Sequence, residues 1–154
     1  ICNPVDLETH LHPGERLIGL DVGTKTIGMA LSDTRRVVAT PFDTIRRTRF
    51  RDDAARLLAE VERHAVGGVI IGLPLALDGG DSPRTQGVRQ FARNLLAYRD
   101  LPLAFWDERL STAAVERAMI EADLSRRRRA ELIDRAAAAY ILQGFLDRMA
   151  RSLG

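Results

Sequence analysis

The 154-residue sequence contains few cysteines, lysines and aromatic residues, and it has no long hydrophobic run. Its single cysteine, Cys2, cannot form an internal disulfide and favours a reducing compartment, so we expect a cytoplasmic protein. Aromatic residues make up 5% of the chain, too few to predict a platform on which bases stack. No apolar stretch approaches the roughly 18 residues that a membrane-spanning helix needs, so we expect no membrane partner.

Arginine carries almost all of the positive charge. Lys25 is the one lysine among 23 basic residues, and the formal net charge of +2 is too small by itself to indicate a nucleic-acid-binding protein. The arginines gather in clusters at residues 35–36, 46–51 and 126–129. Because the planar guanidinium suits phosphate oxygens, the run of four at 126–129 is compatible with binding a polyanion. A solvated surface loop explains the same run equally well.

The length and balance of the chain predict one globular domain. Hydrophobic residues make up 45% and charged residues 29% of the 154 positions, as in ordinary folded domains. Residues 1–15 are polar and contain two prolines, so we expect a loose N-terminal extension. Residues 16–150 then form a single domain.

The predicted elements alternate in a readable order. Short turns after residues 22 and 33 favour three antiparallel strands, and apolar periodicity then predicts helices separated by short, apolar strands. The expected strands are 16–22, 26–33, 36–45, 69–73 and 103–106, and the expected helices are 51–65, 84–98, 111–122 and 130–149. The fold class is therefore α/β, with a mixed five-stranded sheet flanked by helices.

Carboxylates follow the predicted strands where ligands usually bind. Asp21 ends a buried, apolar strand next to Gly23, and a buried carboxylate is costly unless it is paired or bound to a metal. Asp107 and Glu108 follow the last strand. Since the carboxyl ends of parallel strands form one edge of such a sheet, these acids should lie along it. Because successive strand residues face opposite sides, either Asp107 or Glu108 could face the site.

The last helix supplies a further acid. Asp134 lies on the same side as the predicted apolar stripe, which is an uncommon place for a carboxylate. Favourable placement near the start of a helix is the ordinary explanation, but the preceding arginines would oppose the same dipole. Oxygen ligands of this kind suit two Mg²⁺ or Mn²⁺ ions that activate water against a phosphodiester. The histidines and Cys2 lack the spacing of a zinc site, and no phosphate-binding loop with a Gly-Lys ending is present.

Four segments resemble the YqgF/RuvX family. They are Leu20–Asp33, Ile71–Gly79, Asp107–Thr112 and Ile133–Gln143, and they occur in order over roughly residues 16–149. The resemblance implies a ribonuclease H-like fold and a nuclease that matures the 5′ end of pre-16S ribosomal RNA. Members have also been described as Holliday junction resolvases.

The resemblance assigns roles to particular residues. It carries Asp21, Glu108 and Asp134 over as catalytic, metal-binding acids. On this basis we expect Asp21 to bridge two ions. The basic residues expected to contact substrate phosphates are Lys25, Arg109, Arg126, Arg127, Arg128 and Arg129. A salt bridge within residues 107–109 is an equally good explanation of Arg109.

The sequence departs from the family pattern near the expected substrate. Thr26 stands where an arginine is usual, Ala76-Leu77 replaces an Asn-Met pair, and Asp81-Ser82 interrupts a glycine-rich loop. These changes bear on substrate contacts and leave the acids intact.

Several alternatives remain open. The substrate is either precursor ribosomal RNA, with ribosomal particles as further partners, or branched DNA, and the protein is a monomer or a homodimer. The Asp-x-Gly-Thr-Lys segment at 21–25 also resembles the first phosphate loop of actin-like ATPases, although the chain has length for only one such lobe. A non-catalytic RNA-binding module on the same fold would bind nucleic acid without turnover.

Overall fold

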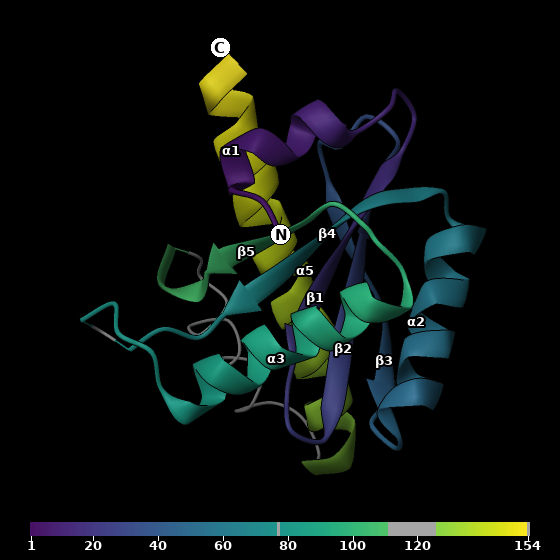
Figure 1. The fold of residues 1–154 in the computed structure, drawn as a ribbon, viewed down its shortest axis with the longest axis vertical. Coiled ribbons are helices and arrows are strands. Elements are labelled where there is room, and N and C mark those ends of the chain that lie inside the picture. Colours follow the sequence, from purple (N-terminus) through teal and green to yellow (C-terminus); the bar gives the residue numbers. More distant parts are fainter. Residues whose placement is uncertain (77, 111–125, 154) are drawn as a thin grey trace.

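A five-stranded sheet forms the centre of the computed structural model, which describes residues 1–76, 78–110 and 126–153 (Figure 1). The strand order is β3-β2-β1-β4-β5. The strands are β1 (Arg16–Val22), β2 (Thr26–Ser32), β3 (Ala39–Arg46), β4 (Val66–Leu73) and β5 (Leu103–Asp107). β1, β2 and β3 pair antiparallel, whereas β4 pairs parallel with both β1 and β5. The predicted mixed sheet is confirmed.

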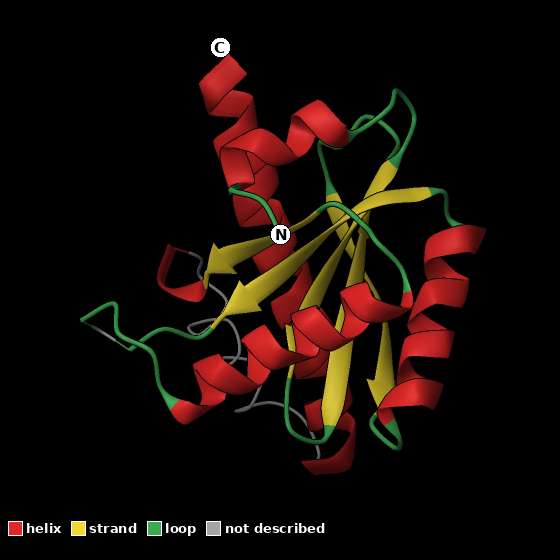
Figure 2. Cartoon of the chain, viewed as in Figure 1, coloured by secondary structure: helices red, strands yellow, loops and turns green. Residues whose placement is uncertain are grey.

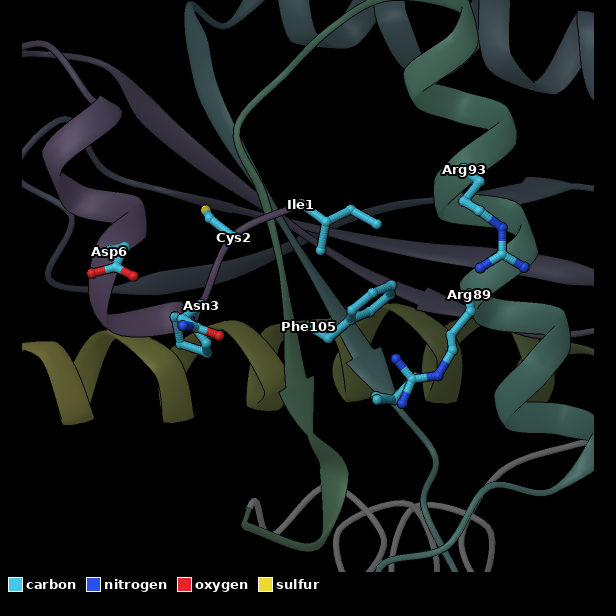
Figure 3. A pocket seen from close by; sticks show the side chains of 9 residues that line it. Ile1, Cys2, Asn3, Asp6, Arg89, Arg93 and Phe105 are labelled. Atoms are coloured by element: carbon cyan, nitrogen blue, oxygen red, sulfur yellow. The ribbon is translucent and has the colours of Figure 1, made fainter.

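Helices cover both faces of the sheet (Figure 2). α2 (Phe50–Arg63) and α3 (Pro83–Tyr98) pack on one face, and α5 (Arg126–Leu153) packs on the other. Alternate residues of each strand feed the two cores: in β1, Ile18 and Leu20 belong to the α2/α3 side and Leu17 to the α5 side. Every residue of β4 is buried, which explains why that strand is wholly apolar. In the described part of the chain, no helix combines the length and apolarity needed to cross a membrane.

The segment before β1 is packed, although a loose extension was expected from its polar composition. It forms α1 (Pro4–Leu7) and a short 3-10 helix, η1 (Glu8–His10). The Leu7 side chain is 0% exposed in the α5-side core. The Cys2 amide donates a 2.8 Å hydrogen bond to the Leu103 carbonyl of β5. One buried leucine and one edge-strand hydrogen bond therefore attach the segment to the sheet.

Several boundaries differ from the predicted ones. The helix expected at 51–65 ends earlier, at Arg63, and the strand expected at 69–73 begins at Val66, so that Gly67 and Gly68 lie within β4. The turn is made instead by Ala65, whose φ of 51° is left-handed. β3 begins three residues later than expected, and α5 is longer than the predicted 130–149. The helix predicted at 111–122 lies outside the described residues.

Glycines on three neighbouring strands allow α5 to approach the sheet closely. A Cβ atom added at Gly19 would lie 2.7 Å from Leu142 Cβ, and one added at Gly72 would lie 2.5 Å from Ile141 Cδ1. At Gly28 the helix backbone itself is in the way, because the added Cβ would lie 2.0 Å from the Asp134 carbonyl oxygen. Any larger residue at Gly28 would therefore push α5 away from the sheet.

We predict that Gly28→Ala lowers the free energy of unfolding by about 1–3 kcal/mol or more, because overpacking forces the backbone to shift. Gly87→Ala is the matched control: nothing lies within 4 Å of its added Cβ, and alanine in a helix is favoured over glycine by roughly 0.5–1 kcal/mol. Urea denaturation measures both changes. Equal stability of the two variants would contradict the close packing of α5.

Candidate active site

Asp21 lies near the end of the central strand and faces α5. It shares the side of β1 that carries Leu17 and Gly19, and it is 3% exposed. The strand buries this carboxylate because its neighbours Leu20 and Val22 anchor the other face in the α2/α3 core. Burial of an ionised group costs several kcal/mol unless ligands compensate it. An ionised Asp21 therefore needs a hydrogen-bond donor or a cation beside it.

Asp134 is brought next to Asp21 by the packing at Gly28. Asp21 and Gly28 are direct partners in the antiparallel pair of β1 and β2. Since the Asp134 carbonyl lies against the Cα of Gly28, the first turns of α5 cover the strand position beside Asp21. The Thr26 hydroxyl, on the same side of β2 as Gly28, donates a hydrogen bond to Asp134 Oδ2. The predicted apolar stripe of α5 is buried, and Asp134 beside it is partly buried.

Glu108 reaches the same face from the other side of β1. It begins the 3-10 turn η2 (Glu108–Leu110) directly after β5. Its Oε1 would lie 2.8 Å from a Cβ added at Gly72 of β4. Gly72 follows Ile71, the partner of Leu20 in the parallel pair, so it lies level with Asp21. Gly28 and Gly72 thus flank Asp21, with Asp134 near the first glycine and Glu108 near the second.

Asp107 faces away from this group. It continues the side of β5 that carries Leu103 and Phe105, which face the α2/α3 core. Its carboxylate accepts hydrogen bonds from the Arg109 amide and Nε at 3.0 Å and from Nη2 at 2.7 Å. The side-chain hydrogen bonds from Arg109 lower the pKa of Asp107, while burial acts in the opposite direction. Of the two acids, Glu108 is the one that shares the face of Asp21.

Arg109 is held by this ion pair. Its guanidinium also lies beside the loop after β4, since a Cβ added at Gly79 would be 3.6 Å from Nη1. That loop is closed by hydrogen bonds from the Ala76 amide to the Gly80 carbonyl and from the Gly79 amide to the Ala76 carbonyl. Leu77 lies outside the described residues. The salt-bridge interpretation of Arg109 is the one that the structure supports.

The remaining predicted phosphate contacts lie at the same end of the sheet. Lys25 is exposed in the turn between β1 and β2. α5 begins at Arg126, and its start and that turn lie at one end of the molecule in Figure 1, whereas the side chains of Arg126 to Arg129 lie outside the described residues. Lys25 directly precedes Thr26, whose hydroxyl bonds to Asp134.

The three acids share a face but are not closed into a coordination sphere. Among the described residues, no group of three or more His, Cys, Asp or Glu side chains is arranged so that it could hold a metal ion. The donor chemistry nevertheless fits a hard divalent cation, because carboxylate oxygens are its preferred ligands. The missing side chains of Gly28 and Gly72 leave room for the Asp134 backbone and the Glu108 carboxylate to approach the strands beside Asp21. A bound cation would need to draw the carboxylates together.

Thr26 and the two flanking glycines were not identified from the sequence as parts of this site. Thr26 was considered only as a departure in substrate contacts, yet its hydroxyl bonds to the candidate acid Asp134. Their spacing could have identified them: Thr26 and Gly28 are two residues apart on one strand, so both lie on the same face of the sheet.

The chain matches a described family over most of its length. A family model described as RuvX, Holliday junction resolvase, matches residues 15–148. A relative from Paramagnetospirillum magneticum is 59% identical over 147 residues, covering 96% of this chain and 95% of the relative. One from Rhodospirillum rubrum is 54% identical, covering 98% and 94%. Both bear the name "Putative pre-16S rRNA nuclease". These matches confirm the predicted class of enzyme, a nuclease.

Solved structures confirm the fold. RuvC of T. thermophilus, in complex with a Holliday junction substrate, is similar with a TM-score of 0.54 at 13% identity, covering 88% of this chain and 96% of that one. The yeast mitochondrial Holliday junction resolvase Ydc2 also gives 0.54 at 13% identity, covering 96% and 85%. At such low identity the similarity concerns the arrangement of strands and helices.

We predict that Thr26 and Asp134 are energetically coupled. A double-mutant cycle of Thr26→Val and Asp134→Ala should give a coupling free energy of about 0.5–3 kcal/mol in urea denaturation, because either change alone removes the hydrogen bond. The control cycle pairs Thr26→Val with Asp147→Ala, whose carboxylate accepts from Gln143 further along α5; it should be additive within about 0.5 kcal/mol. Additivity in both cycles would contradict the contact.

Proposed function

Because the chain belongs to the RuvX Holliday junction resolvase family, we propose that it is a divalent-metal-dependent nuclease that cleaves precursor 16S ribosomal RNA near its 5′ end. The relatives that cover nearly its whole length carry the name of such a nuclease, which supports this substrate. We further propose that it works in the cytoplasm, on RNA within ribosomal particles.

One observation carries the proposal: three acids that are far apart in the sequence lie on one face of the sheet, around the end of the central strand. Asp21 is buried on the α5 face, Gly28 beside it lies under Asp134, and Gly72 on its other side lies against Glu108. A stable core does not require three acids on one covered face. Binding of a shared, positively charged ligand explains why the three acids lie together.

We propose that this ligand is Mg²⁺ or Mn²⁺, with two ions held between the three carboxylates. Asp21 on the central strand, Glu108 and Asp134 are the residues that would hold the ions. When bound, the ions would supply positive charge against the phosphodiester and lower the pKa of a water molecule. The protein contributes the placement: β1 fixes Asp21, η2 fixes Glu108, and the Thr26 hydroxyl orients Asp134.

The basic residues divide into two roles. Lys25 is exposed next to Thr26 and is placed to contact a phosphate beside the cleaved bond. Arg109, in contrast, bonds to Asp107 and so holds the turn that presents Glu108. We therefore propose that Arg109 positions Glu108 and does not contact the cleaved phosphate. Arg126 to Arg129 remain proposed phosphate contacts.

Cleavage of a four-way DNA junction is the second candidate activity. The matching family is described as Holliday junction resolvase, and the similar RuvC structure was solved with such a substrate. Two strands must then be cut, so this activity would favour a symmetric homodimer, whereas RNA cleavage is compatible with a monomer. A cleavage assay with matched RNA precursor and four-way junction, together with molecular mass in solution, separates the two candidates.

We predict that Asp21→Asn reduces Mg²⁺-dependent cleavage by more than about 100-fold, since even the hydrogen-bonding partners of metal ligands typically contribute 10–100-fold. The amide keeps the shape of the side chain, so circular dichroism and nucleic-acid binding should be little changed. The control is Asp43→Asn, a partly exposed acid of β3 that pairs with Arg56 at 3.1 Å. Full activity of Asp21→Asn would rule out the proposed mechanism.

A second pair of variants tests which neighbouring acid acts. Glu108→Gln should lose cleavage as severely as Asp21→Asn, because Glu108 shares the face of Asp21. Asp107→Asn weakens the Arg109 ion pair and should cost much less, within about tenfold if only the turn is loosened. Single-turnover cleavage rates at saturating Mg²⁺ provide the comparison. The reverse order of effects would assign the site to Asp107.

A further inference from the structure

Two segments far apart in the sequence are joined at the end of the sheet where the acids lie. The Arg47 amide donates a 2.8 Å hydrogen bond to the Lys25 carbonyl, and its guanidinium Nη1 donates one of 2.6 Å to the Gly23 carbonyl. Arg46 pairs with Thr26 in the antiparallel register of β2 and β3. The turn that carries Lys25 is therefore fixed against the arginine-rich segment at 46–51.

The arginines of this segment have different environments. Arg47 is half-buried, and its guanidinium lies 5.5 Å from the centre of the Phe91 ring. Its side chain therefore makes internal contacts. Arg46, Arg49 and Arg51 are exposed, as is Lys25. We call these four exposed residues the basic surface. The hydrogen bonds of Arg47 connect the turn that carries Lys25 to the segment that carries Arg46, Arg49 and Arg51.

Within the described part of the chain, few carboxylates oppose Lys25, Arg49 and Arg51. The structure gives Lys25, Arg49 and Arg51 no carboxylate partner among the described residues. Asp53 is buried and accepts hydrogen bonds from the Thr48 amide at 3.1 and 3.2 Å, which holds the start of α2. Among the described residues, Lys25, Arg49 and Arg51 thus face solvent with Asp52 as the exposed acid of the segment.

The basic surface begins where the candidate active site ends. Gly23 is two residues after Asp21, and Lys25 precedes Thr26, which bonds Asp134. Figure 1 shows the turn between β1 and β2, the end of β3 and the starts of α2 and α5 at one end of the molecule. A polymer lying across the acids would extend over the basic surface.

We propose that the basic surface binds the phosphodiester backbone of the nucleic acid next to the cleaved bond, an inference that rests on the proposed nuclease function. Guanidinium groups bond to phosphate oxygens in a bidentate manner, and neutralising phosphates releases counterions. Contacts to the phosphodiester backbone do not read the base sequence. The basic surface would therefore position the strand, and the geometry of the nucleic acid would determine which bond is cleaved. RNA and DNA offer this chemistry equally.

The test combines three substitutions with a matched control. The test variant is Arg46→Gln/Arg49→Gln/Arg51→Gln. The control variant, Arg35→Gln/Arg63→Gln/Arg99→Gln, makes the same charge change at the opposite end of the sheet, where Arg63 and Arg99 pair with Glu60 and Glu62. Fluorescence anisotropy measures affinity for an RNA duplex precursor and a four-way DNA junction. Ca²⁺ replaces Mg²⁺ to separate binding from turnover.

We expect the test variant to bind at least about tenfold more weakly than the control at low salt. Its plot of log affinity against log salt concentration should be shallower by about 2–3, since each lost phosphate contact removes roughly 0.7–0.9 from the slope. Each single variant should show about a third of that change. A preference of the effect for the RNA or the DNA arm would identify which backbone the basic surface accommodates.

Two failures remain distinguishable. If wild-type protein cleaves a substrate with Mg²⁺ or Mn²⁺ but the test variant matches the control in affinity and slope, the basic surface is not an interface and the nuclease proposal stands. If wild-type protein cleaves neither substrate, the proposed function is wrong. If it also binds neither substrate, the basic surface is overturned with it.

Discussion

The close approach of α5 to the sheet is the constraint on which the candidate site depends. Side chains are absent from Gly19, Gly28 and Gly72, so the helix rests on strand backbone, and at Gly28 its own carbonyl occupies the space of a Cβ. Ordinary side chains at these positions would hold the helix further from the strands. Asp134 would then move away from Asp21. Packing density and site geometry are thus set by the same contact.

The second constraint is the alternation of side chains along strands that are buried on both faces. It sends Asp21 and Gly28 to the α5 side, and it sends Asp107 to the opposite side, where Arg109 holds it. Glu108 returns to the α5 side in the turn after β5. One face therefore collects the acids proposed to bind metal, and the rim beyond Asp21 collects exposed cations that suit the substrate.

The sequence predicted the order of strands and helices along the chain and the mixed sheet, and it singled out the candidate acids, because apolar periodicity and carboxylates after buried strands are local signals. It left Asp107 and Glu108 undecided, since β5 is apolar at every position before them and alternation of polarity gives no register there. The polar composition of residues 1–15 also suggested a loose segment. That prediction was wrong because one buried leucine, Leu7, is enough to hold the segment against the core. The link from Arg47 to the Lys25 turn depends on strand pairing between β2 and β3, which no local pattern encodes.

The central claim is that Asp21, Glu108 and Asp134 form one cation site beneath α5. Anomalous diffraction from crystals soaked in Mn²⁺ tests it most directly, because the signal locates the metal independently of the protein atoms. The account predicts strong density in contact with all three carboxylates, between Gly28 and Gly72. Manganese bound only elsewhere, for example at Asp107 or at Asp78 and Asp81, with Asp21 contacting no metal, would contradict it.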